Sequence, residues 1–337
     1  MKALVYTRPG EMQMLERDEP RAADGEVVLK IEAVGICGSD MHAWHGHDPR
    51  RQPGLVLGHE FVGSIVDSKV PGFDLGTRWT GNPLIVCGVC EFCVQGRNNL
   101  CANRTMVGMT RAGAYAEYMS IPAASLIAMP QHMDATVGAL TEPAATAWHA
   151  INLSMRVLER PLHECRVLVI GGGAIGMFAG LLLKHLGVRE LLMTELNPLR
   201  RDAIVEHVGC STIDPRNTPI PDSAFDYVVD AVGAKLTRQQ AFAAVKPGGS
   251  IMHIGLQDWA SEIDMRKLTL AEITLQGTYT YTTADLRAAV AGLDGGVFCD
   301  LSWVEERRLD DGAQAFIDLD QGHCASAKIV LKPGSLA

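Results

Sequence analysis

Basic charge and long apolar runs are both scarce in this chain. Its 337 residues carry a formal net charge of −9, whereas a nucleic-acid-binding protein needs a basic surface that displaces counterions from phosphates. Apolar stretches such as Val167–Ile170 and Leu181–Leu183 are interrupted by Gly, Lys or His, and none approaches the roughly 20 residues that cross a bilayer. These absences predict a protein that binds neither nucleic acid nor membrane.

The sequence also lacks an export signal and the cysteine pattern of a disulfide framework. The nine cysteines are an odd number, so we expect free or metal-bound thiols and a cytoplasmic location. Hydrophobic residues at 47% and charged residues at 20% are ordinary for a globular protein. The length allows two domains, each with its own core.

The most specific motif is a cluster of four cysteines spaced C-x2-C-x2-C-x7-C: Cys87, Cys90, Cys93 and Cys101. Gaps of two residues let neighbouring thiolates converge on one ion, and four thiolates complete a tetrahedral zinc shell with no open position. Two disulfides or an iron–sulfur cluster are the alternatives, and the odd cysteine count argues against the first. The spacing predicts a structural zinc lobe over residues 86–102 and prompts a search for a second, catalytic zinc.

The sequence changes character near Thr141. Before it, short β-rich segments separated by Gly, Pro and Asp predict an irregular β domain. These segments are Met1–Tyr6, Glu26–Val34, Phe61–Val66 and Ala114–Ile121. After an Ala-rich helical segment, Ala135–Ala150, strands alternate with helices as in a doubly wound parallel sheet. The predicted strands and helices are Arg166–Ile170, Ala174–Leu186, Glu190–Thr194, Pro198–Val208, Tyr227–Asp230, Gly249–Ile254 and Ile273–Gly277.

The last part of the chain contains one predicted helix, Thr283–Leu293, and one closing strand, Ala327–Leu331. Because the parallel sheet is already complete before it, we expect this segment to return to the first domain. The predicted fold class is α/β, with a doubly wound parallel sheet and a separate irregular β domain. The predicted domains span residues 1–143, 144–280 and 281–337.

A glycine-rich turn follows an apolar strand and opens a helix. Its pattern, G-x-G-x-x-G, predicts a dinucleotide-binding loop in this context, and a purely structural turn is the alternative. The first glycine permits the tight turn, the second lets a pyrophosphate approach the helix N-terminus, and the third allows close packing of helix and strand. The predicted cofactor-binding residues are Gly171, Gly173, Ala174, Ile175 and Gly176.

The end of the next strand bears on the choice of cofactor. Glu195 would accept hydrogen bonds from the adenosine ribose hydroxyls and would repel a 2′-phosphate, which favours NAD. Arg200 and Arg201 follow closely; they would either serve a phosphate or form a solvated first turn of the next helix. We predict NAD as the cofactor and keep NADP as the alternative.

Three further short motifs carry metal-binding side chains. Cys37 lies in G-I-C-G-S-D-M-H, His59 and Glu60 lie in G-H-E, and Glu142 lies in T-E-P. A thiolate, an imidazole and a carboxylate supply three protein ligands and leave a fourth position for water or substrate, as a catalytic zinc requires. A single cysteine is more often a small buried apolar residue. The prediction therefore depends on these motifs occurring together with the cysteine lobe and the glycine loop.

With all these motifs in the same order, the chain resembles the zinc-dependent medium-chain dehydrogenases/reductases, and within them the polyol (sorbitol-type) branch. The resemblance covers nearly the whole chain. It implies a GroES-like catalytic domain, completed by the C-terminal segment, around a Rossmann domain, with two zinc ions per subunit. It also implies NAD(P)-linked oxidation of a secondary hydroxyl of a sugar alcohol, sugar acid or related diol to a ketone, in a homodimer or homotetramer.

The resemblance assigns metal ligands one by one. Cys37 and His59 match the ligands of the catalytic zinc. Glu60 matches an acidic residue that either enters the zinc shell or supports it. Glu142 stands where alcohol dehydrogenases of the family often have a cysteine, and a glutamate there is similar to the polyol branch. Either Glu60 or Glu142 is therefore expected to be the third ligand.

The resemblance also implies a route for the substrate proton. Asp40 matches a carboxylate that orients the histidine ligand. Ser39 matches the hydroxyl that accepts the proton of the alcohol. His42 matches the histidine that passes this proton to solvent, for which a pKa near neutrality is suitable. These three residues are the predicted catalytic residues.

Several alternatives concern the substrate and the class of function. Sorbitol dehydrogenases tend to carry Arg-Tyr where this chain has Thr280-Tyr281, which argues against sorbitol itself. The loop 42–53 either lines the cleft or is a solvated loop; its candidate side chains are Trp44, His47, Arg50 and Arg51. An L-threonine-3-dehydrogenase-like enzyme is the second hypothesis, because that branch shares C-G-x-D-x-H. A zinc-lobe binding module is the non-enzymatic hypothesis, and the negative charge argues against it.

Overall fold

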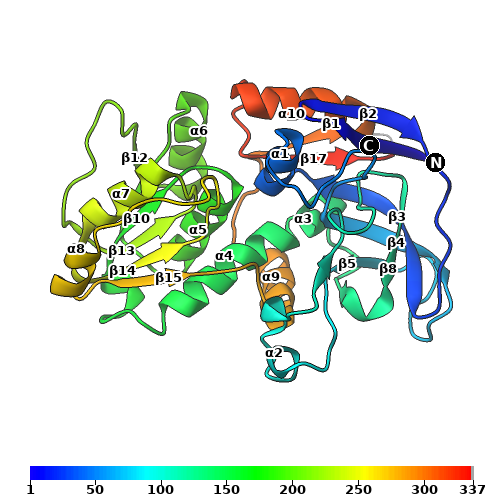
Figure 1. The fold of residues 1–337 in the computed structure, drawn as a ribbon, viewed down its shortest axis with the longest axis horizontal. Coiled ribbons are helices and arrows are strands. Elements are labelled where there is room, and N and C mark those ends of the chain that lie inside the picture. The colour runs from blue at the N-terminus through cyan, green and yellow to red at the C-terminus, as the bar shows by residue number, and fades with distance from the viewer. Residues whose placement is uncertain (335–337) are drawn as a thin grey trace.

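The structure is a computed structural model that describes residues 1–334, and its two halves are built on separate sheets (Figure 1). The first half holds a seven-stranded sheet in the order β16-β17-β3-β4-β5-β9, with β8 paired to β3. Its strands are β3 (Glu26–Gly35), β4 (Glu60–Ser68), β5 (Arg78–Gly81), β8 (Tyr118–Pro122), β9 (Leu126–Ala128), β16 (Val304–Arg308) and β17 (Lys328–Lys332).

Strand β3 is the centre of this sheet, because three strands pair with it in antiparallel fashion. β4 follows most of its length, β8 pairs with its first residues, and β17 pairs near its end at Val34 and Gly35. The β-branched and aliphatic residues of β3 are mostly buried, as suits a strand packed among neighbours. The register places Gly35 opposite Glu60. The segment after β3 and the segment before β4 therefore meet at one end of the sheet.

The other elements of the first half surround this sheet. A small antiparallel pair lies beside it, and a short helix begins directly after β3. A lobe carries two short strands and one helical turn. In chain order these elements are β1 (Lys2–Arg8), β2 (Glu11–Glu16), α1 (Gly38–Trp44), β6 (Leu84–Ile85), α2 (Glu91–Val94), β7 (Thr105–Met106), α3 (Ala135–Ala139) and α10 (Gly312–Gln321).

The second half is a six-stranded sheet in the order β12-β11-β10-β13-β14-β15, and every neighbouring pair is parallel. This is the strand order of a Rossmann fold, in which ligands bind beyond the carboxyl ends of the strands. Its elements are β10 (Arg166–Ile170), α5 (Ala174–His185), β11 (Glu190–Thr194), α6 (Pro198–Ala203), β12 (Ser211–Ile213), β13 (Phe225–Asp230), α7 (Lys235–Ala244), β14 (Val245–His253), α8 (Met265–Leu270) and β15 (Thr274–Gly277). The α/β fold class with its parallel sheet is confirmed.

One predicted helix is divided in the structure. The Ala-rich segment predicted as one helix forms α3 and then α4 (Thr141–Ser154), with a break at Leu140. Pro143 lies in the first turn of α4, where its missing N–H costs no helical hydrogen bond. In the middle of one long helix the same proline would clash with a preceding carbonyl. The break places Glu142 at a helix start, on the border between the two halves.

The last segment of the chain contributes to both halves. Helix α9 (Thr283–Asp294) lies beside α4, and strands β16 and β17 then extend the first sheet through β3. β1, near the start of the chain, and β17, near its end, therefore lie on the same half (Figure 1). The predicted last segment, 281–337, includes residues 335–337, which lie outside the described residues. Within residues 1–334, no helix combines the length and apolar character needed to cross a membrane.

Candidate active site and metal groups

The paired ends of β3 and β4 bring three metal-binding side chains together. Ligand atoms of Cys37, His59 and Glu60 all lie within 4.8 Å of one another. Cys37 directly precedes α1, His59 directly precedes β4, and Glu60 is the first residue of β4. A Cβ atom on Gly35 would lie 2.0 Å from Oε2 of Glu60, so only glycine allows this approach. The register of two strands thus unites ligands that are distant in the sequence.

Asp40 lies directly behind the histidine of this group. Its Oδ1 is 3.5 Å from Nδ1 of His59, while its Oδ2 accepts hydrogen bonds from the Tyr115 hydroxyl at 2.7 Å and from the Cys37 amide at 3.2 Å. Burial opposes ionisation of Asp40, but the charges of His59 and Arg51 and the hydrogen bond from Tyr115 hold its pKa at about 2. The carboxylate is therefore ionised beside His59.

Glu60 has a buried partner from the far end of the sequence. The Lys328 ammonium on β17 lies 2.7 Å from each carboxylate oxygen of Glu60 and also donates to the Ile36 carbonyl at 2.8 Å. The side chains of Glu60 and Lys328 are both almost fully buried. Sequence reasoning missed Lys328. Its signal in the sequence was a lysine directly before the apolar run Ile329–Leu331 of the closing strand.

Glu142 lies at the start of α4 and has a different partner. The Tyr281 hydroxyl donates to its Oε1 at 2.7 Å. Burial raises the pKa of Glu142 to about 7, so its carboxyl group is poised between two protonation states. Glu142 does not belong to the group of residues whose ligand atoms all lie within 4.8 Å of one another. The structure thus groups Glu60 with Cys37 and His59, and it places Glu142 against Tyr281.

The two predicted relay residues both lie on α1. The Ser39 hydroxyl is 3.5 Å from Nε2 of His59 and accepts a hydrogen bond from Arg51 at 3.2 Å. His42 is half-buried one turn further along, and its pKa is lowered by burial and then by the nearby charges of His47, His45 and Arg51. Ser39 is thus beside the metal-compatible group, and His42 lies between Ser39 and the end of the helix.

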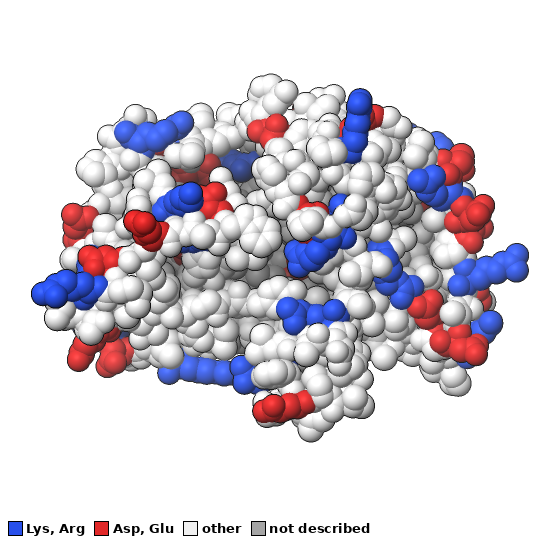
Figure 2. Space-filling view, viewed as in Figure 1, with Lys and Arg blue, Asp and Glu red and all other residues white. Residues whose placement is uncertain are grey.

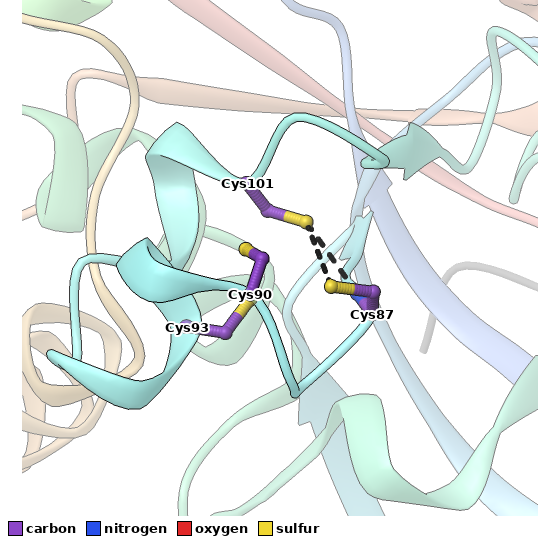
Figure 3. A group of neighbouring side chains, drawn as sticks. All are labelled: Cys87, Cys90, Cys93 and Cys101. Atoms are coloured by element: carbon purple, nitrogen blue, oxygen red, sulfur yellow. Dashed lines mark hydrogen bonds between the residues drawn. The ribbon is translucent and has the colours of Figure 1, made fainter.

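The four cysteines of the lobe converge as the spacing predicts (Figure 3). Their sulfur atoms lie within 4.8 Å of one another, and all four are free thiols. Backbone N–H groups of Val89 and Cys90 lower the pKa of Cys87 to about 6. In contrast, burial and neighbouring thiols raise the pKa of Cys93 to about 12. The cluster therefore favours some thiolate character, but it cannot hold four adjacent thiolates without a cation.

The lobe is attached to the helices between the two halves by a polar network that sequence reasoning did not find. The Asn99 amide donates to the Tyr279 carbonyl at 2.8 Å and lies 3.5 Å from Nε2 of His149 on α4. Nδ1 of His149 is 2.8 Å from Asp285 on α9. Burial opposes ionisation of Asp285, yet hydrogen bonds from His149 and Thr282 hold its pKa at about 2. A chain of hydrogen bonds thus connects the lobe with α4 and α9.

The glycine loop has the geometry that dinucleotide binding requires. Gly171 adopts a φ of +99°, and a Cβ on Gly176 would lie 1.9 Å from the Gly171 carbonyl oxygen. Gly173 forms the N-cap of α5, and a Cβ there would meet no atom within 4 Å. Ala174 and Ile175 are the first helical residues. Glycine therefore stands at the position of the tight turn, Gly171, and at the position of close packing, Gly176. The backbone at Gly173 is open to a ligand.

The residues after β11 are held by their own neighbours. The two carboxylate oxygens of Glu195 accept from the amides of Gly172 and Asn197, each at 2.8 Å. Arg201 donates to the carbonyls of Glu195 and Leu196 at 2.8 Å. Arg200 approaches Cys324 in the last segment of the chain. Glu195 is thus fixed at the glycine loop, and Arg201 is engaged by backbone carbonyls.

Comparison with known proteins identifies the family. Residues 23–131 match the alcohol dehydrogenase GroES-like domain, and residues 174–294 match the zinc-binding dehydrogenase domain. An L-threonine 3-dehydrogenase from Chelativorans sp. (strain BNC1) is 32% identical over 294 residues, which cover 83% of each chain. The chain belongs to the zinc-dependent medium-chain dehydrogenases/reductases, and it is an NAD(P)-dependent alcohol-type dehydrogenase.

Solved structures with the same fold cover nearly the whole chain. A protein from Sinorhizobium meliloti 1021 described as a zinc-binding dehydrogenase, bound to NADP, aligns with a TM-score of 0.88 at 28% identity and covers 98% of this chain and 99% of its own. Acetophenone reductase from Geotrichum candidum NBRC 4597, in complex with NAD, aligns with a TM-score of 0.88 at 26% identity, covering 98% and 96%. The predicted combination of a Rossmann fold and a GroES-like domain is confirmed.

The residues present fit zinc and a dinucleotide. Despite burial, the negative charges of Asp40 and Cys37 raise the pKa of His59 well above its usual value, so this site favours a positive charge. The four clustered thiols of the lobe have the donor chemistry of a closed zinc shell. The open backbone at Gly173, at the N-terminus of α5, leaves room for a pyrophosphate to approach the helix.

Proposed function

We propose that this dehydrogenase oxidises a secondary hydroxyl of a small polyhydroxylated compound or hydroxy acid to a ketone. The supporting observation is the group Cys37, His59 and Glu60 with the Ser39 hydroxyl at its edge. Turnover of a substrate panel, followed by NADH absorbance, tests the proposal. Reduction of the cofactor by polyols or hydroxy acids is expected, and reduction by simple primary alcohols alone would contradict it.

We infer that Cys37 and His59 hold the catalytic zinc together with Glu60 or Glu142. When bound, zinc supplies a Lewis acid at the substrate oxygen, and NAD supplies the hydride acceptor. Asp40 fixes the ring of His59. The assignment of the third ligand is tested by metal analysis of Glu142→Ala and Glu60→Gln; the true ligand is the one whose loss lowers zinc content.

Within this site, Ser39 accepts the hydroxyl proton of the substrate while its own proton leaves toward His42. The lowered pKa of His42 keeps its ring neutral near pH 7 and thus able to accept a proton. Ser39→Ala is expected to reduce kcat by about 100-fold, the typical contribution of a positioned acid–base group. Normal turnover in that variant would remove Ser39 from the proton route.

Two substrate classes have separate support. The buried carboxyl of Glu142, held by Tyr281, offers hydrogen bonds to the neighbouring hydroxyls of a diol, which favours a polyol or sugar acid. L-Threonine is the second candidate, because the relative from Chelativorans sp. is an L-threonine 3-dehydrogenase. A comparison of kcat/KM for L-threonine with that for sugar alcohols and sugar acids decides between them.

We infer that NAD is the preferred cofactor. Glu195 lies at the position expected for the ribose, and Arg201 is occupied by backbone carbonyls, so a 2′-phosphate would face the carboxyl group of Glu195 and not the guanidinium of Arg201. Parallel titrations with NADH and NADPH test this proposal. Tighter binding of NADPH would contradict it, and the NADP complex of the protein from Sinorhizobium meliloti makes the measurement necessary.

We further propose two zinc ions per subunit and a homo-oligomer. The oligomer is supported by β15, which among residues 1–334 is an edge strand of the parallel sheet, and by exposed apolar side chains in the chain segment that leads from β14 into β15, namely Leu256, Trp259, Met265, Leu270 and Leu275. Such an edge is suited to pairing with a second copy. Light scattering with metal analysis gives both numbers, and a monomer with one zinc would contradict both proposals.

A further inference from the structure

Arg51 is a buried arginine that reaches into the active site without being a metal ligand. It belongs to the loop 42–53, and only 3% of its surface is exposed. Its Nη2 donates to the Ser39 hydroxyl at 3.2 Å, and its Nη1 donates to the Ser39 carbonyl at 3.2 Å. Both the side chain and the backbone of Ser39 are therefore held by one guanidinium group. The alternative of a solvated loop does not apply to this residue.

The remaining N–H groups of Arg51 are also engaged. Nε donates to the Gly108 carbonyl at 3.1 Å, Nη1 donates to Asp48 at 2.7 Å, and Nη2 lies 3.8 Å from Oδ1 of Asp40. A guanidinium has five N–H groups, and these contacts use four of them and direct the fifth at a carboxylate. Arg51 has no donor left for a substrate. Its contact with the reaction therefore passes through Ser39.

We propose that Arg51 is a positioning residue that orients the Ser39 hydroxyl for proton transfer. A hydroxyl oxygen has two lone pairs and one hydrogen. Arg51 occupies one lone pair, so the other lone pair and the hydrogen of Ser39 point away from Arg51; Nε2 of His59, at 3.5 Å, is a second polar atom beside this hydroxyl. This inference rests on the proposed role of Ser39 as proton acceptor.

The proton balance leaves Arg51 unchanged. The substrate O–H bond breaks as its proton moves to Oγ of Ser39, and the Ser39 O–H bond breaks as the original proton leaves toward His42. Arg51 stays protonated throughout, because its guanidinium does not deprotonate in proteins. Its contribution is the direction of the hydroxyl and a fixed positive charge beside it.

A double-mutant cycle tests this coupling. The holoenzyme variants are Arg51→Met, Ser39→Ala and the combination of both, assayed with the best substrate found. Arg51→Met alone is expected to lower kcat by about tenfold, whereas in the Ser39→Ala background it changes kcat by less than about twofold, because the group through which it acts is gone. Equal losses in both backgrounds would overturn the proposal. Arg51→Lys, which keeps the charge but loses the planar fork, is expected to recover part of the loss.

Two further measurements separate orientation from folding. A crystal structure of Arg51→Met is expected to show Ser39 in more than one side-chain rotamer, with the zinc content unchanged; a single unaltered rotamer would contradict the proposal. Arg111→Met is the control variant. Arg111 also belongs to the first half of the protein, but its guanidinium donates to Glu26 and Ser120 instead of to Ser39. The control variant is expected to lose stability with kcat retained.

The outcome also distinguishes this proposal from the proposed function. If Ser39→Ala turns over normally while zinc removal abolishes activity, the dehydrogenase proposal stands and the positioning role of Arg51 is wrong. If no substrate in the panel reduces NAD, the proposed function itself fails. If Arg51→Met does not fold, Arg51→Lys replaces it in the double-mutant cycle with Ser39→Ala, so the coupling between the two residues is still measured.

Discussion

The two metal-compatible groups of this protein are built in opposite ways. The four cysteines of the lobe come from one short stretch and are mostly half-exposed, with Cys101 alone fully buried. Cys37, His59 and Glu60 lie at or beside the paired ends of β3 and β4 and are enclosed by charged side chains, among them Asp40 and Lys328. A local turn is enough for a closed structural shell. An open catalytic site needs distant residues, because it must also control charge, proton transfer and access.

The difference is sharpest in the charges around each group. The lobe cysteines interact with backbone amides and with one another. The group of Cys37, His59 and Glu60 includes one buried ion pair, Lys328 with Glu60, and lies near a second, Arg51 with Asp48. Elsewhere, basic and acidic side chains are interspersed over the face shown in Figure 2. The structure thus concentrates buried charge at the site where charge would move in the reaction.

The largest expected effect is the loss of turnover when the catalytic group is broken. His59→Ala removes the imidazole of the proposed zinc site, and kcat is expected to fall at least about 1,000-fold. Metal analysis should show the loss of one zinc per subunit while the lobe zinc remains. Substantial activity in this variant would mean that the chemistry takes place elsewhere.

The second prediction concerns the four-cysteine lobe. Cys93→Ser opens the four-thiol shell, and the free energy of unfolding is expected to fall by several kcal/mol, since zinc binding contributes directly to folding. The measurement is urea denaturation with metal analysis, together with kcat per remaining zinc. A large drop in kcat with unchanged stability would contradict a structural role for the lobe.

The third prediction concerns the lysine that neutralises Glu60. Lys328→Met leaves a buried carboxylate without its partner, which costs about 3–5 kcal/mol of stability. The double variant Lys328→Met with Glu60→Gln removes the uncompensated charge and should recover part of this loss, as thermal unfolding can show. If the double variant is no more stable than the single one, the ion pair is not the origin of the effect.

The smallest expected effect is in the network that attaches the lobe. Asp285→Asn is expected to lower stability by about 1–2 kcal/mol, because hydrogen bonds to a charged group are lost. The pKa of Asp285 is depressed to about 2 in the folded protein, so its contribution is fully present above the unfolded value of about 4. It disappears as pH falls toward 2. Urea denaturation at pH 7 and pH 3 should show a smaller difference between variant and parent at the lower pH.

Features that depend on neighbouring residues could be predicted well. The turn from β10 through Gly171 into α5 follows from an apolar run, a glycine pattern and a helix start. The cysteine lobe follows from spacing alone. Helix boundaries were less accurate, because the break before Pro143 depends on where the first turn of α4 begins. The proximity of Cys37 to His59 could be inferred only by resemblance, since no local rule joins them.

Contacts between distant segments could not be predicted from the residues. Lys328 meets Glu60 across 268 positions of sequence, and Tyr281 meets Glu142 across 139. Nothing in the sequence near Arg51 indicates that its side chain is buried against Ser39 rather than solvated. These residues have partners only because β17 joins β3, α9 lies beside α4 and the loop after α1 folds inward.

The sequence by itself therefore determined the parallel sheet, the glycine loop, the thiol lobe and the types of the metal-binding side chains. All of these depend on spacing within a few residues, where the backbone geometry is nearly constant. Only the tertiary structure shows which glutamate lies beside Cys37 and His59, which cation faces it, and which arginine holds Ser39. These choices depend on burial and on strand register, because a buried charge persists only where the fold brings a partner to it.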